Sequence, residues 1–368
     1  MPARRLKGGW GIDAVGVFPL DAAMNEPFEI ATGAKTVVAN VLVRVRLENG
    51  VVGWGEGAPS ADGRHESQAS VLALLKKAAR RLPGRDIRAW RALLEDIDDA
   101  LPGQGVARAA LGMAVLDAWA RRAGVPLRTI FGGAQDRVAS DVTVTIVPPE
   151  RARAAAKRIV SLGVRTIKIK IGRDVDEDYE RVLAVNAVGK NLKLMLDANQ
   201  GYSVRQALLL LKKLARRRIK PVLFEQPVPR GDDDGLKSVE RFGGVPVAAD
   251  ESAATRQDIL RLAQKRACSV VNIKLMKGGW LEAWDIALIA RAAGMRLMIG
   301  GMVESSLAMT ASAHFAAGLG SFDFVDLDTP LWFKKDPMRG VSFGKGGIYD
   351  LSEVAAGIGV KPGPSLKV

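Results

Sequence analysis

Five charged residues recur along the middle of this chain at nearly even spacing. Lys170 is followed by Asp197, Glu225, Asp250 and Lys274, at steps of 27, 28, 25 and 24 residues. Each of them ends a short apolar run and precedes a segment with helical spacing. Repeated strand–helix units of this kind build closed parallel barrels, in which the carboxyl ends of the strands meet at one mouth. The spacing therefore predicts three carboxylates and two lysines around a single point.

The three acidic residues have the chemistry of a metal site. Carboxylates from three successive strand ends suit a hard, octahedral ion, most simply Mg²⁺. We therefore predict one Mg²⁺ per subunit on Asp197, Glu225 and Asp250. Zinc fits less well, because the only two histidines, His65 and His314, lie far from these motifs in the sequence. His314 is interpreted as a packed helix residue rather than a catalyst.

A second lysine accompanies the first one. Lys168 and Lys170 lie two residues apart on a predicted strand, so both point to one face, while the isoleucines at 167, 169 and 171 point to the other. Lysines aimed into a barrel are costly to bury unless they are paired or functional. The alternative is an exposed strand face, which the apolar flanks disfavour.

The elements that position these residues alternate strictly from Arg137 onward. The predicted strands cover residues 138–147, 164–171, 192–197, 221–225, 245–250, 270–274, 295–300 and 322–326. Helical segments lie between them, although the last helix is not clear. Eight strands are the number that a (β/α) barrel needs. The fold class predicted for residues 133–333 is therefore a modified (β/α) TIM-type barrel.

The first 132 residues have a different pattern, which predicts an α+β capping domain. Residues 35–56 alternate as a hairpin does, and three helical segments follow at 66–82, 87–99 and 106–123. Residues 21–36 contain Pro27 and Gly33 without a clear period, and they are predicted to form a loop. The glycine- and proline-rich segment 334–368 is predicted to pack back on this domain.

Composition excludes several classes of partner. The net charge is +14, but the basic residues are scattered over helical segments without aromatic interleaving, which indicates a solvated face and no nucleic acid. No apolar run is long enough for a membrane span. The single Cys268 excludes an internal disulfide and fits a reducing compartment. We expect a cytoplasmic protein that forms a homo-oligomer.

Five short motifs carry a family resemblance. Lys-x-Lys at 168–170, Asp-Ala-Asn at 197–199, Glu-Gln-Pro at 225–227, Asp-Glu-Ser at 250–252 and Asn-Ile-Lys-Leu at 272–275 occur in this order. Together they resemble the enolase superfamily in its muconate-lactonizing subgroup, over nearly the whole chain. The resemblance implies an Mg²⁺-dependent abstraction of the proton next to a carboxylate, which gives an enediolate. By position, Lys170 and Lys274 would act as bases on opposite faces, and Lys168 would stabilise the carboxylate charge.

Two further features bear on the mechanism. A lysine acts as a base near neutral pH only if its pKa falls, and burial, Mg²⁺ and a second lysine would all lower it. The segment 300–305 contains no histidine, which argues against the mandelate racemase branch. In this segment we expect Met302 and Glu304 to contact the substrate.

The substrate is indicated by two other segments. Asp326 and Asp328 resemble the Asp-x-Asp motif of dipeptide epimerases, whose aspartates hold the substrate ammonium group; the alternative is a solvated pair. Residues 27–35 resemble the segment that carries a substrate-binding arginine in L-alanyl-glutamate epimerases. Here the matching residue is Lys35, which lacks the bidentate geometry of arginine. A contact with the substrate and a plain exposed loop lysine therefore both remain open.

These features together predict an isomerase, a dipeptide epimerase that moves a proton at the α-carbon of the second residue. Three relatives share the metal and lysine motifs: o-succinylbenzoate synthase, N-acylamino acid racemase and muconate cycloisomerase. Their substrates have no free ammonium group, so an Asp-x-Asp pair would have no function in them. A binding protein without catalysis is the remaining alternative, and a complete set of buried charges argues against it.

Overall fold

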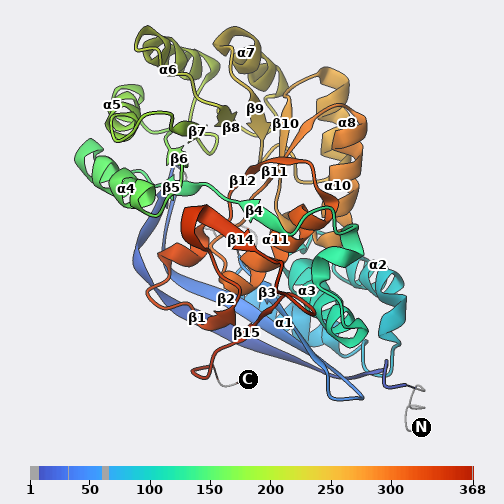
Figure 1. The fold of residues 1–368 in the computed structure, drawn as a ribbon. Helices are drawn as coiled ribbons and strands as arrows, with labels where there is room; N and C mark the ends of the chain where they lie inside the picture. The colour runs from blue at the N-terminus through green and yellow to red at the C-terminus, as the bar shows by residue number, and fades with distance from the viewer. Residues whose placement is uncertain (1–7, 32, 60–65, 367) are drawn as a thin grey trace.

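The computed structural model describes residues 8–31, 33–59, 66–366 and 368 (Figure 1). It contains a parallel barrel surrounded by helices and a separate N-terminal domain, in which helices pack on a three-stranded antiparallel sheet. The predicted fold class is confirmed.

Eight parallel strands form the barrel, and strands that follow one another in the sequence are neighbours in the sheet. They are β5 (Val142–Val144), β6 (Thr166–Lys170), β7 (Lys193–Asp197), β8 (Leu223–Glu225), β9 (Val247–Ala249), β10 (Val270–Ile273), β11 (Arg296–Ile299) and β12 (Phe322–Val325). The edge strands β5 and β12 meet where the Asp141 N–H donates to the Val325 carbonyl at 2.9 Å. The carboxyl ends of the strands therefore form a ring.

Helices follow seven of the eight strands and cover the outside of the ring (Figure 1). They are α4 (Pro149–Ser161), α5 (Val175–Asn186), α6 (Val204–Arg216), α7 (Asp233–Gly243), α8 (Arg256–Lys265), α9 (Leu275–Gly278) with α10 (Trp280–Ala292), and α11 (Ser306–Leu319). Sequence signals place several of their starts; for example, Ser203 and Gln206 form a capping box at the start of α6. In the described chain, β12 is followed by a short 3₁₀ helix, Thr329–Trp332, instead of an eighth α-helix. This explains why the last helix was not clear in the sequence.

A small apolar layer fills the inside of the barrel. It consists of Met195, Leu223, Ala248, Val270 and Met298, one residue from each of the strands β7 to β11. Side chains alternate between the two faces of a strand, so residues two positions further along point to the same face. At the mouth, the apolar layer is therefore followed on β7 to β10 by the polar residues Asp197, Glu225, Asp250 and Asn272.

The N-terminal domain packs a helix closely against a sheet. The sheet contains β1 (Ile12–Ile30), β2 (Gly33–Leu47) and β3 (Val52–Gly57), and the helices are α1 (Gln68–Ala79), α2 (Trp90–Ala100) and α3 (Gly105–Ala123). A Cβ atom on Gly55 would lie 2.1 Å from the Ala110 carbonyl oxygen, and one on Gly53 would lie 2.2 Å from the Ala118 nitrogen. Glycine at alternate positions of β3 thus lets α3 lie on the backbone of the sheet.

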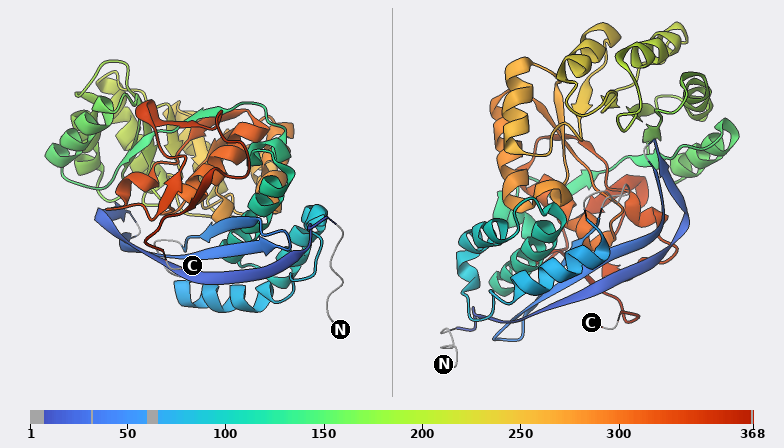
Figure 2. Two further views of the ribbon diagram at one scale, coloured as in Figure 1. Left: turned by 60° about the horizontal axis from the view of Figure 1, so that its bottom comes forward. Right: turned by 180° about the vertical axis from the view of Figure 1, so that it is seen from behind.

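The predicted loop at 21–36 is wrong, because residues 21–30 and 33–36 extend the sheet. β1 continues to Ile30 and pairs with β2 through Phe28 opposite Lys35. Pro27 lies in the irregular stretch between Ala23 and Phe28, where a missing N–H breaks no regular ladder. Apolar contacts hold this extension to the barrel, since the rings of Phe28 and Trp332 meet edge to face at 5.0 Å. Figure 2 shows the two long strands curving from the N-terminal domain to the mouth of the barrel.

The predicted strand at 138–147 is also wrong, because it is divided in two. β4 (Arg137–Ala139) pairs with β14 (Ile348–Asp350), whereas β5 enters the barrel. Ser140 separates them, and its N–H donates to the Gly347 carbonyl at 2.8 Å.

The C-terminal segment contacts both parts of the molecule. Its strands β13 (Met338–Gly340) and β15 (Val360–Pro362) pair with each other. Arg121 of α3 donates to the Val360 carbonyl, and the Tyr349 hydroxyl donates to the Leu327 carbonyl of the barrel. The boundaries after residues 132 and 333 stay a prediction.

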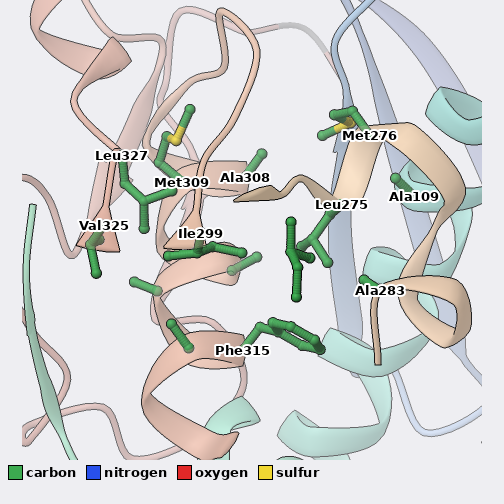
Figure 3. Packing of buried hydrophobic residues seen from close by; sticks show 14 of the residues in the cluster. Ala109, Leu275, Met276, Ala283, Ile299, Ala308, Met309, Phe315, Val325 and Leu327 are labelled. Atoms are coloured by element: carbon green, nitrogen blue, oxygen red, sulfur yellow. The ribbon is translucent and has the colours of Figure 1, made fainter. Parts of the chain in front are cut away.

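One large hydrophobic cluster joins the two domains. Figure 3 shows the part in which Leu275 and Met276 of α9 lie near Ala109 of α3. Among the described residues, no helix has the length and apolar character needed to cross a membrane.

Candidate active site

The structure brings the predicted lysines and acids together in a ring at the mouth of the barrel. Lys168 and Lys170 lie on β6, and Asp197 and Glu225 end β7 and β8. Asp250 and Lys274 directly follow β9 and β10. All six side chains are buried. The even spacing in the sequence thus corresponds to successive strand ends.

Lys168 lies at the centre of the acidic residues. Its Nζ is 2.6 Å from Asp326 Oδ2, 2.7 Å from Glu225 Oε2 and 3.0 Å from Asp197 Oδ2. These carboxylates come from strands on both sides of β6. One buried ammonium group therefore links the acids on β7 and β8 to the acid after β12.

Lys170 and Lys274 lie on opposite sides of the mouth. β6 and β10 are four places apart in the ring of eight strands. Lys170 Nζ is 2.6 Å from Asp197 Oδ2, and Lys274 Nζ is 2.8 Å from Asp250 Oδ2. Two amines on opposite sides of a bound substrate can remove a proton from one side of a carbon and return one from the other.

Three further residues complete the site, and the sequence analysis assigned them no role. Asn199 accepts a hydrogen bond from Lys170, and Asn272 donates to Glu225 Oε1 at 2.7 Å. Lys277 Nζ lies 2.7 Å from Asp250 Oδ1 and also donates to three backbone carbonyls. The sequence could have indicated the two asparagines, because each lies two residues from Asp197 or Lys274 and therefore close to the same mouth.

The pKa values of the three predicted metal ligands are shifted in different directions. Burial acts to raise the pKa of Asp197, but Lys168 and Lys170 outweigh it and lower that pKa to about 2. Burial also acts to raise the pKa of Asp250, but the charges of Lys274 and Lys277 outweigh it and bring that pKa below its usual value. Glu225 differs, since burial and the charge of Asp197 raise its pKa to about 7.

Around Lys168 and Lys274, negative charges outweigh burial, which by itself lowers the pKa of a lysine. The lowered pKa of the base, to which Mg²⁺ would contribute, stays a prediction. The negative charges of Asp197, Asp326 and Glu225 outweigh burial and raise the pKa of Lys168 well above its usual value. Asp250 and Glu225 likewise raise the pKa of Lys274. The surrounding carboxylates therefore determine the charge of these lysines.

The donor set fits a hard cation. Glu225 Oε2 and Asp250 Oδ1 are buried carboxylate oxygens, and each has a lysine Nζ at 2.7 Å as its charged partner. Oxygens of this kind keep the capacity to bind a metal. Among the described residues, the acidic group whose oxygens lie within 4.8 Å of one another is a different one: Asp141, Asp326 and Asp328.

Asp326 and Asp328 form a buried pair at the end of β12, so the solvated alternative is wrong. Asp328 Oδ2 accepts the Thr143 N–H at 2.6 Å, which links the pair to β5. Burial and the charge of Asp326 raise the pKa of Asp328 to about 6. The third acid, Asp141, was missed because it lies within a run predicted to be one continuous strand.

The remaining predicted contacts lie where the hairpin meets the barrel. Lys35 is half-buried on β2, and its Nζ donates to the Pro59 carbonyl at 3.1 Å. Burial outweighs Glu56 and Glu304 and lowers the pKa of Lys35 to about 8. Lys35 is therefore not a plain exposed loop lysine. Glu304 Oε1 accepts the Met302 N–H at 2.7 Å, and burial together with the charge of Glu56 raises the pKa of Glu304 to about 8.

Glu56 joins the N-terminal domain to this part of the barrel. It extends from β3 and accepts the Ser305 N–H at 3.0 Å, at the start of α11. An acid at a helix N-terminus satisfies free N–H groups and complements the helix dipole. His314, further along α11, accepts the Arg128 N–H, and burial lowers its pKa to about 3. It is a neutral packing residue.

Comparison with known proteins gives matches over both parts of the chain. The family model for the "Enolase C-terminal domain-like" fold matches residues 150–365. The model for the "Mandelate racemase / muconate lactonizing enzyme, N-terminal domain" matches residues 14–132.

Similar proteins are dipeptide epimerases, which are isomerases. An aromatic dipeptide epimerase of Herpetosiphon aurantiacus is 43% identical over 94% of this chain and 97% of its own length. A hydrophobic dipeptide epimerase of Citrifermentans bemidjiense is 39% identical over 93% of this chain and 95% of its own. The structure of a dipeptide epimerase from Enterococcus faecalis, complexed with Mg and L-Leu-L-Tyr, has a TM-score of 0.91 at 35% identity, covering 95% of this chain and 99% of that one.

Proposed function

Because the chain belongs to the mandelate racemase and muconate lactonizing enzyme family of the enolase superfamily, we propose that it is an Mg²⁺-dependent dipeptide epimerase. It would invert the α-carbon of the second residue in a dipeptide with a free amino terminus. One observation carries this proposal: Lys170 and Lys274 face each other across a mouth that also contains a buried acidic pair, Asp326 and Asp328.

The metal would bind to Asp197, Glu225 and Asp250, one ion per subunit. Bound there, Mg²⁺ would supply the positive charge that offsets the charge developing on the substrate carboxylate. The same positive charge would offset the carboxylate charges that raise the pKa of the lysines. A lower pKa favours the neutral amine that a base needs.

The residues of the chain then have separate tasks. One of Lys170 and Lys274 takes the α-proton from its face, and the other returns a proton on the opposite face. Lys168 holds the substrate carboxylate by its charge. Glu304 has a pKa raised to about 8 by burial, so near neutral pH it is largely protonated and can donate a hydrogen bond to an oxygen of the substrate.

The amino-terminal residue of the substrate is recognised at Asp326 and Asp328, whose negative charge suits an ammonium group. Lys35 and Met302 contact the second residue of the substrate. Lys35 would pair with an acidic side chain, if the substrate has one. We also propose that the protein is cytoplasmic, for which the single Cys268, without a disulfide partner in the chain, is the supporting feature. A homo-oligomer is part of the same proposal.

The test of this substrate class is the variant Asp328→Asn. We expect the KM for a free L-alanyl dipeptide to rise about tenfold or more, because a charged hydrogen bond to the ammonium group becomes a neutral one. Mg²⁺ affinity should change little, since Asp328 lies outside the three metal ligands. The matched control is Asp323→Asn, an exposed aspartate on the same strand β12. An unchanged KM in Asp328→Asn, or an equal rise in the control, would contradict the assignment.

A further inference from the structure

Asp141 is a buried acid that the proposed mechanism does not use. It precedes β5, is 1% exposed, and neither of its carboxylate oxygens has a hydrogen-bond partner. A charged group in this condition is costly to bury. Its environment must therefore provide a compensating positive charge or a proton.

The surroundings of Asp141 are acidic. One oxygen each of Asp141, Asp326 and Asp328 lies within 4.8 Å of the other two. Lys168 is the neighbouring cation, and its Nζ already contacts Asp326 Oδ2 while it balances Asp197 and Glu225. Asp328 keeps one buried oxygen, Oδ1, without a partner. The cluster thus has more acceptors than Lys168 can satisfy.

The number of these oxygens matches an ammonium group. An –NH₃⁺ group has three N–H donors, and the three oxygens, within 4.8 Å of one another, are close enough to accept from one nitrogen. Three carboxylates for three N–H donors are therefore a better match than the two aspartates of the Asp-x-Asp motif alone.

We propose that Asp141 is the third carboxylate of the substrate ammonium site and thereby selects ligands with a charged terminal amine. This inference rests on the proposed function, because the ligand is the dipeptide of that reaction. Asp141 is fixed for this task by the closure of the barrel, since its own N–H donates to the Val325 carbonyl at 2.9 Å, next to Asp326. The seam between β5 and β12 thus sets the distance between the three acids.

The experiment measures ligand binding separately from turnover. L-Ala-Gly has the terminal ammonium group but no stereocentre at its second residue, and its binding to the Mg²⁺-loaded enzyme can be followed by calorimetry. We expect Asp141→Asn to weaken its binding about tenfold or more, because an amide removes one charged acceptor. N-acetyl-L-Ala-Gly should bind weakly to the parent enzyme and no more weakly to the variant. Asp323→Asn is the control, and thermal melting reports whether each variant is folded.

The outcomes separate this inference from the proposed function. Parent-like binding of L-Ala-Gly by folded Asp141→Asn overturns the role of Asp141, whereas the proposed function stands if the parent enzyme epimerises dipeptides. A parent enzyme that binds L-Ala-Gly through Asp141 but epimerises no dipeptide overturns the function and leaves the ammonium site intact. Titration with Mg²⁺ alone tests whether the acidic cluster is a metal site. Two Mg²⁺ sites per chain, one of which is lost in Asp141→Asn, would show that it is and would overturn the inference. If Asp141→Asn does not fold, Asp141→Glu keeps the charge, and a parent-like preference for the free amine supports the inference while its loss contradicts it.

Discussion

Removing either Lys170 or Lys274 is expected to abolish most epimerisation, while exchange of the α-proton with solvent persists for one of the two epimers. Each alanine variant should epimerise at least about 10²-fold more slowly than the parent, the lower range for loss of a general acid or base. Each should nevertheless exchange the α-proton of one epimer with solvent, because the lysine on the other face remains. The two variants should retain opposite epimers. Proton NMR in D₂O with the L,L and L,D forms of one dipeptide measures both quantities.

The geometry of the site requires controls for these two variants. Loss of a buried lysine leaves Asp197 or Asp250 with fewer partners, and an uncompensated buried charge destabilises the fold. Lys170→Met and Lys274→Met keep the length of the side chain and serve as second variants, with thermal melting to check folding. Lys193→Ala, at the exposed amino end of β7, is the matched control and should retain full activity. Parent-like epimerisation by folded Lys170 and Lys274 variants would show that the two lysines are not the bases.

Loss of the metal is the second large effect. The parent enzyme should lose α-proton exchange in EDTA and regain it with Mg²⁺, because a divalent ion supplies more positive charge to the substrate carboxylate than Lys168 alone does. Asp197→Asn, Glu225→Gln and Asp250→Asn should each weaken Mg²⁺ binding and exchange together. We expect at least about a 100-fold loss, since even residues that only support a ligand cost 10- to 100-fold. Calorimetry gives the affinity, and NMR gives the exchange rate.

Two results would contradict the metal prediction. Full α-proton exchange in exhaustively chelated protein would show that the reaction does not need Mg²⁺. A variant that loses exchange but binds Mg²⁺ as the parent does would assign its residue a task other than metal binding. Asp323→Asn, whose exposed side chain is remote from the ring of acids, should leave both quantities unchanged.

The sequence was sufficient to predict the barrel and the residues that its mouth brings together. Side chains on a strand alternate with a period of two, and parallel strands end on one side, so Asp197, Glu225 and Lys274 follow from local patterns alone. The missing eighth helix was visible as the lack of a helical period after residue 326. No single-sequence pattern, however, gives the distances between these groups.

The features that the sequence did not predict depend on contacts between distant segments. The predicted loop at 21–36 contains a proline and a glycine and lacks a period, yet residues 21–30 and 33–36 lie in strands, where Phe28 packs on Trp332 beside the barrel. Asp141 was overlooked because its importance comes from Asp326 and Asp328, which lie at the other end of the barrel sequence. The charges that surround the lysines depend on the fold in the same way, since the carboxylates that outweigh burial at Lys274 come from other strands.

The central claim is that this enzyme inverts the second α-carbon of dipeptides with a free amine. It is tested most directly by proton NMR in D₂O, with the Mg²⁺-loaded parent enzyme, a panel of L-alanyl dipeptides and the N-acetyl form of each. The account predicts that the α-proton signal of the second residue disappears and the other epimer accumulates for at least one free dipeptide, while its N-acetyl form reacts far more slowly. A buried aspartate pair without its cation keeps a desolvation cost that the acetylated ligand does not offset. Equal rates on the two forms, or faster reaction of the N-acetyl form, would contradict the account and favour an N-acylamino acid racemase.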